Sequence, residues 1–283
     1  MSLDNLSGRS YGPIDFDVTR AGVARFVEAT GDDPGRWTDR APPSLAAAAL
    51  FAVVPSFLED PDVAPTARTA VHAEQSFTWH RALRVGQTLA VSGTVEEIRS
   101  RARLNVVTFE VTAGDEEPWL SSTSTFVLSD AAAGSADEEP EPPDADRGPC
   151  DPVAALPLAS VGDAVAPVRR SASRADLVRY AAATGDWNPI HWDHDAARNA
   201  GMAGVIVHGL LMAAWLAQVA ARYGADPAPL RSMRVRFRAP LRPAVEALVT
   251  GEVVSAHPGG AEIALELRAG DARLVTAAVG VTR

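Results

Sequence analysis

The sequence holds a single cysteine and no apolar stretch long enough to cross a bilayer. Cys150 has no partner for an internal disulfide, which suits a reducing compartment. The longest apolar run, residues 45–54, falls well short of the roughly 20 residues of a spanning helix, and residues 1–13 lack the apolar core of a signal peptide. We therefore expect a cytoplasmic protein with no membrane partner.

Basic side chains are also in deficit. The chain has 26 Lys and Arg against 36 Asp and Glu, a net charge of −10, which argues against a nucleic-acid partner or an anionic membrane. Hydrophobic residues make up 47% and charged residues 22%, as in globular proteins. A length of 283 residues allows one large domain or two ordinary ones.

Residues 131–149 contain no bulky apolar side chain. Six acidic residues and one arginine give this segment a net charge of −5, half that of the whole chain. Such a segment cannot bury a core and is typical of a linker. We predict a first domain over residues 1–130, an acidic, proline-rich linker over 131–150 and a second domain over 151–283.

The two predicted domains resemble each other. Residues 23–32 align without a gap with residues 177–186, and both segments read as short amphipathic helices that end in Gly-Asp. Two further matches follow in the same order, one around Phe77 and Phe237, the other between residues 91–95 and 249–253. Three matches in one order indicate a duplicated domain.

Each half continues with a long apolar helix and then strands. The helices are expected over residues 44–59 and 209–223, and in the second one only Gln218 is polar between residues 210 and 221. A helix that is apolar all round must be covered on all sides. The strands are expected over residues 70–79, 88–99, 105–113, 119–128, 232–239, 247–255, 262–268 and 274–281. Turn signals between them favour antiparallel pairing, so we predict an α+β fold in which two curved sheets wrap two helices and join at their edges.

The polar residues with chemical potential gather in the second half. Asp186, Asn188 and His191 fall within six residues that Pro189 stiffens, and the sequence His-Gly at 208–209 then opens the second apolar helix. A polar cluster beside an apolar helix is typical of a buried acid–base site.

This stretch resembles a known signature. Residues 184–191, Thr-Gly-Asp-Trp-Asn-Pro-Ile-His, together with Ala197 and the Val-His-Gly of residues 207–209, are similar to the motif of the (R)-specific enoyl-CoA hydratases. That family is also called the MaoC-like dehydratases or hydratase 2. Residues 72–75 and 79–86 resemble the motif-lacking N-terminal hot dog of its two-domain members. The resemblance implies a double hot dog and reversible hydration of trans-2-enoyl thioesters to (R)-3-hydroxyacyl thioesters.

Such a hydration needs a base for water, a proton for the α-carbon and a donor for the thioester oxygen. We expect Asp186 and His191 to hold one water and to share the acid–base work, with His191 the more basic at neutral pH. Asn188 would hold the water or fix the loop. Gly209 opens the helix, where backbone N–H groups are unpaired, so it is the candidate oxyanion donor. The resemblance implies the same roles for Asp186, His191 and Gly209.

A metal site is the alternative interpretation of these residues. Asp186, His191, Asp193, His194 and His208 offer nitrogen and oxygen ligands, but their spacing matches no familiar ligand set. Asp193 is better explained as the N-cap of a helix that starts at residue 194, and His208 as a support for the loop. We therefore expect no metal.

Arginines 234, 236 and 238 fall on one face of a strand. They are either solvated or in contact with the phosphates of coenzyme A or the phosphopantetheine of an acyl carrier protein. Trp187 and Trp192 flank the polar cluster, where they either wall a pocket or only pack.

The first half lacks the polar loop. After Asp32 no histidine precedes the first apolar helix, so we expect one working site per chain, with the first half shaping the acyl pocket. One departure concerns a turn: the second half reads Leu-Arg-Pro-Ala over residues 241–244, where the family resemblance implies Pro-Gly.

Three functions remain open from the sequence. The favoured one is a hydro-lyase, an enoyl-thioester hydratase or dehydratase. A hot-dog thioesterase and a non-catalytic thioester-binding scaffold are the alternatives. No cofactor is expected, because coenzyme A or phosphopantetheine would be part of the substrate, which is an acyl-CoA or an acyl carrier protein. The chain would act as a pseudo-dimeric monomer or as a homodimer.

Overall fold

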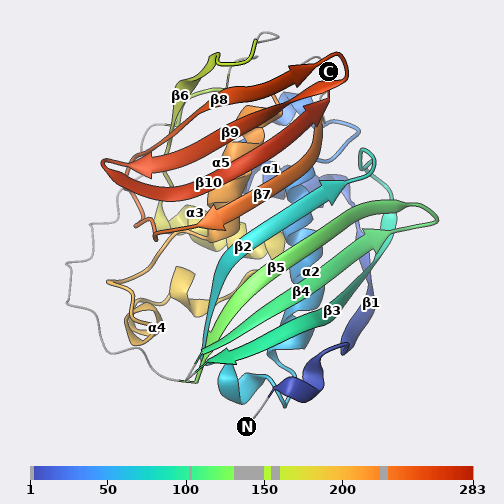
Figure 1. Ribbon diagram of the computed structural model, residues 1–283, viewed down its shortest axis with the longest axis vertical. Coiled ribbons are helices and arrows are strands. Elements are labelled where there is room, and N and C mark those ends of the chain that lie inside the picture. The colour runs from blue at the N-terminus through green and yellow to red at the C-terminus, as the bar shows by residue number, and fades with distance from the viewer. Residues whose placement is uncertain (1–2, 102–103, 131–149, 154–159, 224–228, 283) are drawn as a thin grey trace.

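The computed structural model describes residues 3–101, 104–130, 150–153, 160–223 and 229–282 (Figure 1). The predicted linker lies outside the described residues except for Cys150, so the proposed domain boundaries stay a prediction. None of the described helices has both the length and the apolar character needed to cross a membrane.

Within the described ranges, ten strands form one antiparallel sheet in the order β1-β3-β4-β5-β2-β7-β10-β9-β8-β6. The first five come from the first half of the chain and the last five from the second, and they repeat the same order outward from the central β2–β7 pair (Figure 1). The strands are β1 (Ser10–Asp17), β2 (Thr69–Trp79), β3 (Thr88–Arg101), β4 (Leu104–Gly114), β5 (Pro118–Ser129), β6 (Ala164–Arg170), β7 (Leu230–Phe237), β8 (Ala247–His257), β9 (Gly260–Ala269) and β10 (Ala272–Thr282). The expected duplication and edge-to-edge junction are confirmed.

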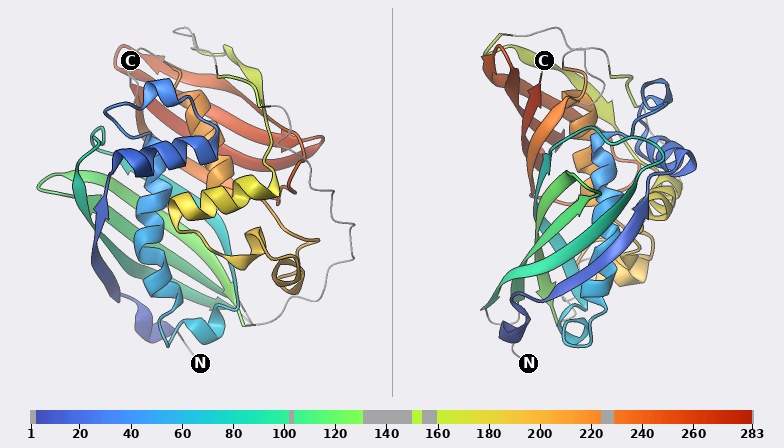
Figure 2. Two further views of the ribbon diagram at one scale, coloured as in Figure 1. Left: turned by 180° about the vertical axis from the view of Figure 1, so that it is seen from behind. Right: turned by 90° about the vertical axis from the view of Figure 1, so that its right-hand side faces the viewer.

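The residues that the structure describes form five α-helices, which lie on one side of this sheet (Figure 2). They are α1 (Arg20–Thr30), α2 (Ala46–Leu58), α3 (Arg174–Thr184), α4 (His194–Asn199) and α5 (Gly209–Ala220). The apolar helices α2 and α5 run along this side of the sheet (Figure 2), and every residue of α5 from Leu210 to Ala220 is buried. Its one polar side chain, Gln218, donates to the carbonyl oxygen of Thr30 and accepts from Arg170. Burial on all sides is the condition that the apolar sequence required.

The short helices α1 and α3 end as the Gly-Asp pattern predicted. Gly31 and Gly185 have φ angles of 67° and 82°, a left-handed conformation that glycine adopts without steric cost. The two helices pack across the pseudo-symmetry axis, where the rings of Phe26 and Tyr180 lie 6.2 Å apart. This packing brings the end of α3, and the residues that follow it, close to the first half.

The sequence-based prediction missed the two outermost strands, β1 and β6. Both contain a proline, Pro13 and Pro167, which usually indicates that a segment is not a strand. Each strand lies at an edge of the sheet, and its ladder shifts register beside the proline. An edge strand tolerates proline because the missing N–H faces no partner on the open side.

The central β2–β7 ladder covers only part of β2. Pairing runs from Thr78 opposite Ser232 to Glu74 opposite Arg236, and the segment from Thr69 to Ala73 lies beyond its end. There the side-chain amide of Asn188 donates to the carbonyl oxygen of Ala70 at 3.2 Å. The polar loop of the second half is thus held on β2, the first-half strand at the centre of the whole sheet.

The turn that departs from the family pattern keeps a left-handed geometry. Ala244 has a φ of 62° and is the one described non-glycine residue with positive φ. Its N–H donates to the carbonyl oxygen of Ala172 at 2.8 Å, which fixes the conformation. The backbone therefore adopts the shape that glycine would favour, and the alanine adds strain.

Candidate active site

Asp186 is positioned by the end of α3. Gly185 turns the chain, and the N–H of Asp186 donates to the Thr184 hydroxyl at 3.3 Å. The Asp186 carboxylate accepts from the N–H of Asn188 at 3.4 Å, and the residue is only 7% exposed. A carboxylate is therefore held at the inner end of the loop, largely shielded from solvent.

Asn188 forms two hydrogen bonds that fix the loop. Its Oδ1 accepts from the N–H of Ile190 at 3.3 Å, capping the single 3₁₀ turn Pro189–His191, and its Nδ2 donates to Ala70. Both ends of the amide thus bind protein groups. Of the two expected roles for Asn188, the contacts favour the structural one.

His191 ends this 3₁₀ turn and is fixed by its other ring nitrogen. Nδ1 lies 2.9 Å from the carbonyl oxygen of Ile206, so Nδ1 carries the hydrogen and Nε2 presents a lone pair. His191 is 6% exposed. Its ring can accept a hydrogen bond from a water or a substrate at Nε2.

Burial shifts the pKa of both groups. Desolvation raises the pKa of Asp186 to about 7, against a weaker opposite effect of the Asn188 N–H, and it lowers the pKa of His191 to about 4. The expectation that His191 is the more basic of the two is therefore wrong: the carboxylate is the stronger base in this environment. Near neutral pH, Asp186 can either give or take a proton.

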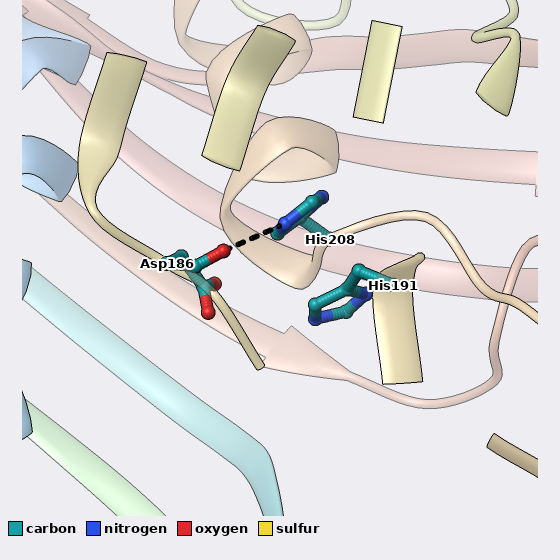
Figure 3. A group of neighbouring side chains, drawn as sticks. All are labelled: Asp186, His191 and His208. Carbon is teal, nitrogen blue, oxygen red and sulfur yellow. Dashed lines mark hydrogen bonds between the residues drawn. The ribbon is translucent and has the colours of Figure 1, made fainter. Parts of the chain in front are cut away.

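His208 and Gly209 complete the cluster at the start of α5. His208 Nε2 donates to the backbone carbonyl oxygen of Asp186 at 3.2 Å, as the dashed line in Figure 3 shows. Gly209 is the first residue of the helix, where an N–H has no intrahelical partner. A side chain at this position would come within 3.2–3.4 Å of the Phe237 ring, so glycine leaves the close approach open. The expectation that His208 supports the loop is consistent with these contacts.

A carboxylate oxygen of Asp186 and one ring nitrogen each of His191 and His208 all lie within 4.8 Å of one another (Figure 3). This upper limit is close to the span of a water that makes two hydrogen bonds of about 2.8 Å, so the spacing is compatible with the water expected between Asp186 and His191. A metal fits less well. The rings of His191 and His208 are stacked, with centroids 3.8 Å apart and planes at 23°. A ligating imidazole holds its ion close to the ring plane, and two stacked rings point past a common ion.

The sequence-based metal alternative also included Asp193 and His194. Asp193 accepts from the N–H of Ala196 at 3.0 Å and is the N-cap of α4, as predicted. Neither residue belongs to the cluster that the described residues form.

A cavity of about 740 Å³ adjoins the cluster, a size suited to a small-molecule substrate. Asp186, Asn188, His191 and Gly209 all line it. Its remaining wall is largely apolar and includes residues of α2 and of the start of β2, among them Phe51, Val54, Leu58, Val71 and His72. Both halves of the chain therefore build the cavity. His72 belongs to the segment 72–75 that carries the family resemblance, whereas no motif marked the other first-half residues as cavity-lining.

The remaining predicted binding residues divide into two groups. Arg238 and Trp187 line the cavity, and both are exposed to solvent. Among the described lining residues, Arg234, Arg236 and Trp192 are absent: Arg236 pairs with Glu74 at 3.0 Å, and Trp192 donates its Nε1–H to the backbone oxygen of Trp187. A second arginine that the sequence did not indicate, Arg68, also lines the cavity and is exposed.

The geometry defines a class of protein: a duplicated fold of helix-wrapping sheets with one buried acid–base cluster beside a largely apolar cavity. Comparison with protein families gives the same answer. The MaoC-like domain matches residues 158–270, and the FAS1-like dehydratase domain region matches residues 5–117. The described cluster lies within the first of these matches.

Individual relatives extend the match over most of the chain. The 3-hydroxyacyl-thioester dehydratase X of Mycobacterium tuberculosis is 30% identical over 254 residues, which cover 88% of this chain and 82% of that protein. A solved MaoC-like dehydratase superposes with a TM-score of 0.83 at 22% identity, covering 99% of both chains. A Mycobacterium tuberculosis protein described as a double hot dog superposes with a TM-score of 0.65 at 15% identity, covering 98% and 96%.

The chain belongs to the MaoC-like dehydratase family. The predicted double hot dog fold is confirmed, and so is the assignment to a family of hydro-lyases.

Proposed function

We propose that this protein catalyses the reversible hydration of trans-2-enoyl thioesters to (R)-3-hydroxyacyl thioesters, with the dehydration as the reverse reaction. The observation that carries the proposal is the cluster itself: a buried carboxylate with a pKa near neutrality, an imidazole lone pair and a helix N-terminus face one cavity. Membership of a dehydratase family supports the same chemistry.

Asp186 carries the proton. In its ionised form it takes one proton from water while the water oxygen bonds to the β-carbon, and the π electrons of the double bond move onto the thioester as an enolate. The α-carbon then takes the proton from Asp186, which returns to the carboxylate. His191 Nε2 accepts a hydrogen bond from the other O–H of the water, which stays in the product hydroxyl, and so keeps the oxygen aimed at the β-carbon. Because one carboxylate serves both steps, both additions occur on the same face.

Gly209 stabilises the charge that develops on the thioester oxygen. Its N–H lies at the first position of α5, where the helix dipole also favours a negative charge. Removing an oxyanion donor of this type typically costs roughly 10²–10³ in rate.

The substrate enters beside the two exposed arginines of the cavity wall. Arg68 and Arg238 offer positive charge to the phosphates of coenzyme A or to the phosphopantetheine of an acyl carrier protein, while the acyl chain lies along α2 and β2. Binding roles for Trp187, Trp192, Arg234 and Arg236 stay predictions. No separate cofactor takes part in this scheme.

Two finer expectations are part of the proposal. The lone cysteine favours a reducing, cytoplasmic location. The paired halves favour a chain that is already a complete pseudo-dimer, and light scattering after gel filtration will show whether it dimerises again.

The test is a direct assay. Purified protein is mixed with crotonyl-CoA and with longer trans-2-enoyl-CoAs, loss of the conjugated double bond is followed by absorbance, and the alcohol is analysed by chiral chromatography. We expect the (R)-alcohol. Asp186→Asn and His191→Phe should each lower kcat by on the order of 10²–10⁴ without loss of the folded protein. Release of free thiol without hydration would instead support a thioesterase, and binding without turnover a scaffold.

A further inference from the structure

His208 is an unusual residue for the start of a helix. Helix N-caps are mostly Ser, Thr, Asp or Asn, whose side chains accept a backbone N–H, whereas the His208 side chain makes no such bond. The residue is nevertheless fully buried. A buried imidazole costs free energy unless it forms useful contacts, so its partners explain its presence.

Those partners are the two groups of the proposed acid–base site. His208 Nε2 donates to the backbone oxygen of Asp186 at 3.2 Å, and the flat face of its ring stacks on His191 with 3.8 Å between centroids (Figure 3). The next residue in the chain is Gly209. One rigid ring therefore touches Asp186 and His191 and is joined through the backbone to the candidate oxyanion donor.

The hydrogen-bond pattern fixes the state of this ring. Because its Nε2 faces a carbonyl oxygen, Nε2 must carry the hydrogen. Burial and the neighbouring His191 hold the pKa of His208 well below its usual range, so the ring is neutral. The third titratable neighbour is Tyr180, whose ring lies 4.8 Å away and whose pKa is raised by burial.

His191 is consequently held in two directions. The Ile206 carbonyl oxygen fixes its edge through Nδ1, and His208 supports its face. These two contacts together set the direction of the Nε2 lone pair. Loss of the stacked ring would remove the support of one face of His191 and leave the Nδ1 hydrogen bond in place.

We propose that His208 is a positioning residue. It fixes the backbone of Asp186 and the ring plane of His191 relative to the Gly209 N–H, so that all three groups contact the same substrate molecule. His208 is not among the described residues that line the cavity, so it acts through these groups and touches no reacting atom. The inference rests on the proposed hydratase function. Displacement of a reacting group by about 1 Å is sufficient to lower a rate by on the order of 10².

Two substitutions separate the two contacts. His208→Phe keeps a flat ring for stacking and loses the N–H donor, whereas His208→Asn keeps a donor and loses the ring. We expect each to lower kcat for trans-2-enoyl-CoA hydration by roughly 10- to 100-fold, with KM changed less than about threefold, because substrate contacts are unaltered. His208→Ala should lower kcat further than either.

The matched control is Gln218→Leu. Gln218 is also a buried polar residue of α5, but it lies at the far end of the helix and contacts Arg170 and Thr30. The Gln218→Leu variant should lose about as much stability as the His208 variants and keep the kcat of wild type. A kcat within about twofold of wild type for both His208→Phe and His208→Asn would overturn the proposal. So would a fall in kcat that Gln218→Leu reproduces at equal stability.

A second measurement does not depend on activity. Long-range proton–nitrogen NMR on the full chain at neutral pH should show a neutral His208 with its hydrogen on Nε2 and a neutral His191 with its hydrogen on Nδ1. A protonated His208, or a hydrogen on its Nδ1, would contradict the inferred contact. If wild-type protein shows these tautomers but hydrates no enoyl-CoA, the proposed function fails and the arrangement stands without its catalytic meaning.

Discussion

Removal of the Asp186 charge should make the protein more stable while it destroys the proposed activity. The pKa of Asp186 is about 7 in the folded protein and near 3.8 for an ordinary aspartate, because burial disfavours the ionised form. A difference of about three pKa units corresponds to roughly 4 kcal/mol of unfavourable free energy once the group is ionised in both states. Asp186→Asn cannot ionise and avoids this cost.

The sign of the effect follows from the direction of the shift. Below about pH 4 the side chain is protonated in both the folded and the unfolded chain, so the charge has no effect on stability. As the pH rises from about 4 to about 7 the unfolded chain loses its proton first, and wild-type stability falls. Above about pH 7 the penalty is complete and constant.

The assay is urea unfolding of wild type and Asp186→Asn at several pH values. The stability difference in favour of the variant should widen by about 2–3 kcal/mol between about pH 5 and about pH 8. Gln218→Leu, which removes a buried polar side chain without a change of charge, should differ from wild type by a constant amount. A stability difference between wild type and Asp186→Asn that stays flat with pH would refute the inference that Asp186 is a desolvated acid.

Two further predictions concern the pH profile and the strained turn. The kcat/KM of hydration should fall about tenfold per pH unit below about pH 7 and level off above it, because the carboxylate form of Asp186 is the active one. A maximum of kcat/KM at acidic pH would exclude Asp186 as the base. Ala244→Gly should raise the free energy of unfolding by about 0.5–1 kcal/mol and leave kcat unchanged, because Ala244 has a φ of 62°. Denaturant unfolding checks this, and a loss of stability would show that the turn is not strained.

Local patterns in the sequence were sufficient to predict most of the fold. The two apolar helices, the two Gly-Asp helix ends and the eight inner strands follow from periodicity and glycine positions, and all are present. The edge strands β1 and β6 were missed because each contains a proline, which usually argues against a strand. A proline is tolerated there because an edge strand has a hydrogen-bonded neighbour on one side only. Edge position is a property of the whole sheet and is not visible in a short window.

The motif also predicted which residues meet, but not their electrostatics. Asp186, Asn188, His191 and Gly209 all line one cavity, as expected. Their order of basicity was wrong, because a sequence does not reveal how deeply a carboxylate will be buried. The same reason explains why the Asn188 contact with the first half could not be foreseen: it joins residues 118 positions apart.

The hydrogen bond from Asn188 to Ala70 has an evolutionary consequence. The first half, which lacks the motif, provides the backbone oxygen that binds the motif loop of the second half. The sequences of the two halves therefore cannot change independently at this contact. Changes near the start of β2 would move the reactive loop, even though that strand contributes no reacting group. The start of β2 both lines the cavity and holds the reactive loop, so selection for a different acyl chain and selection for turnover act on the same backbone segment.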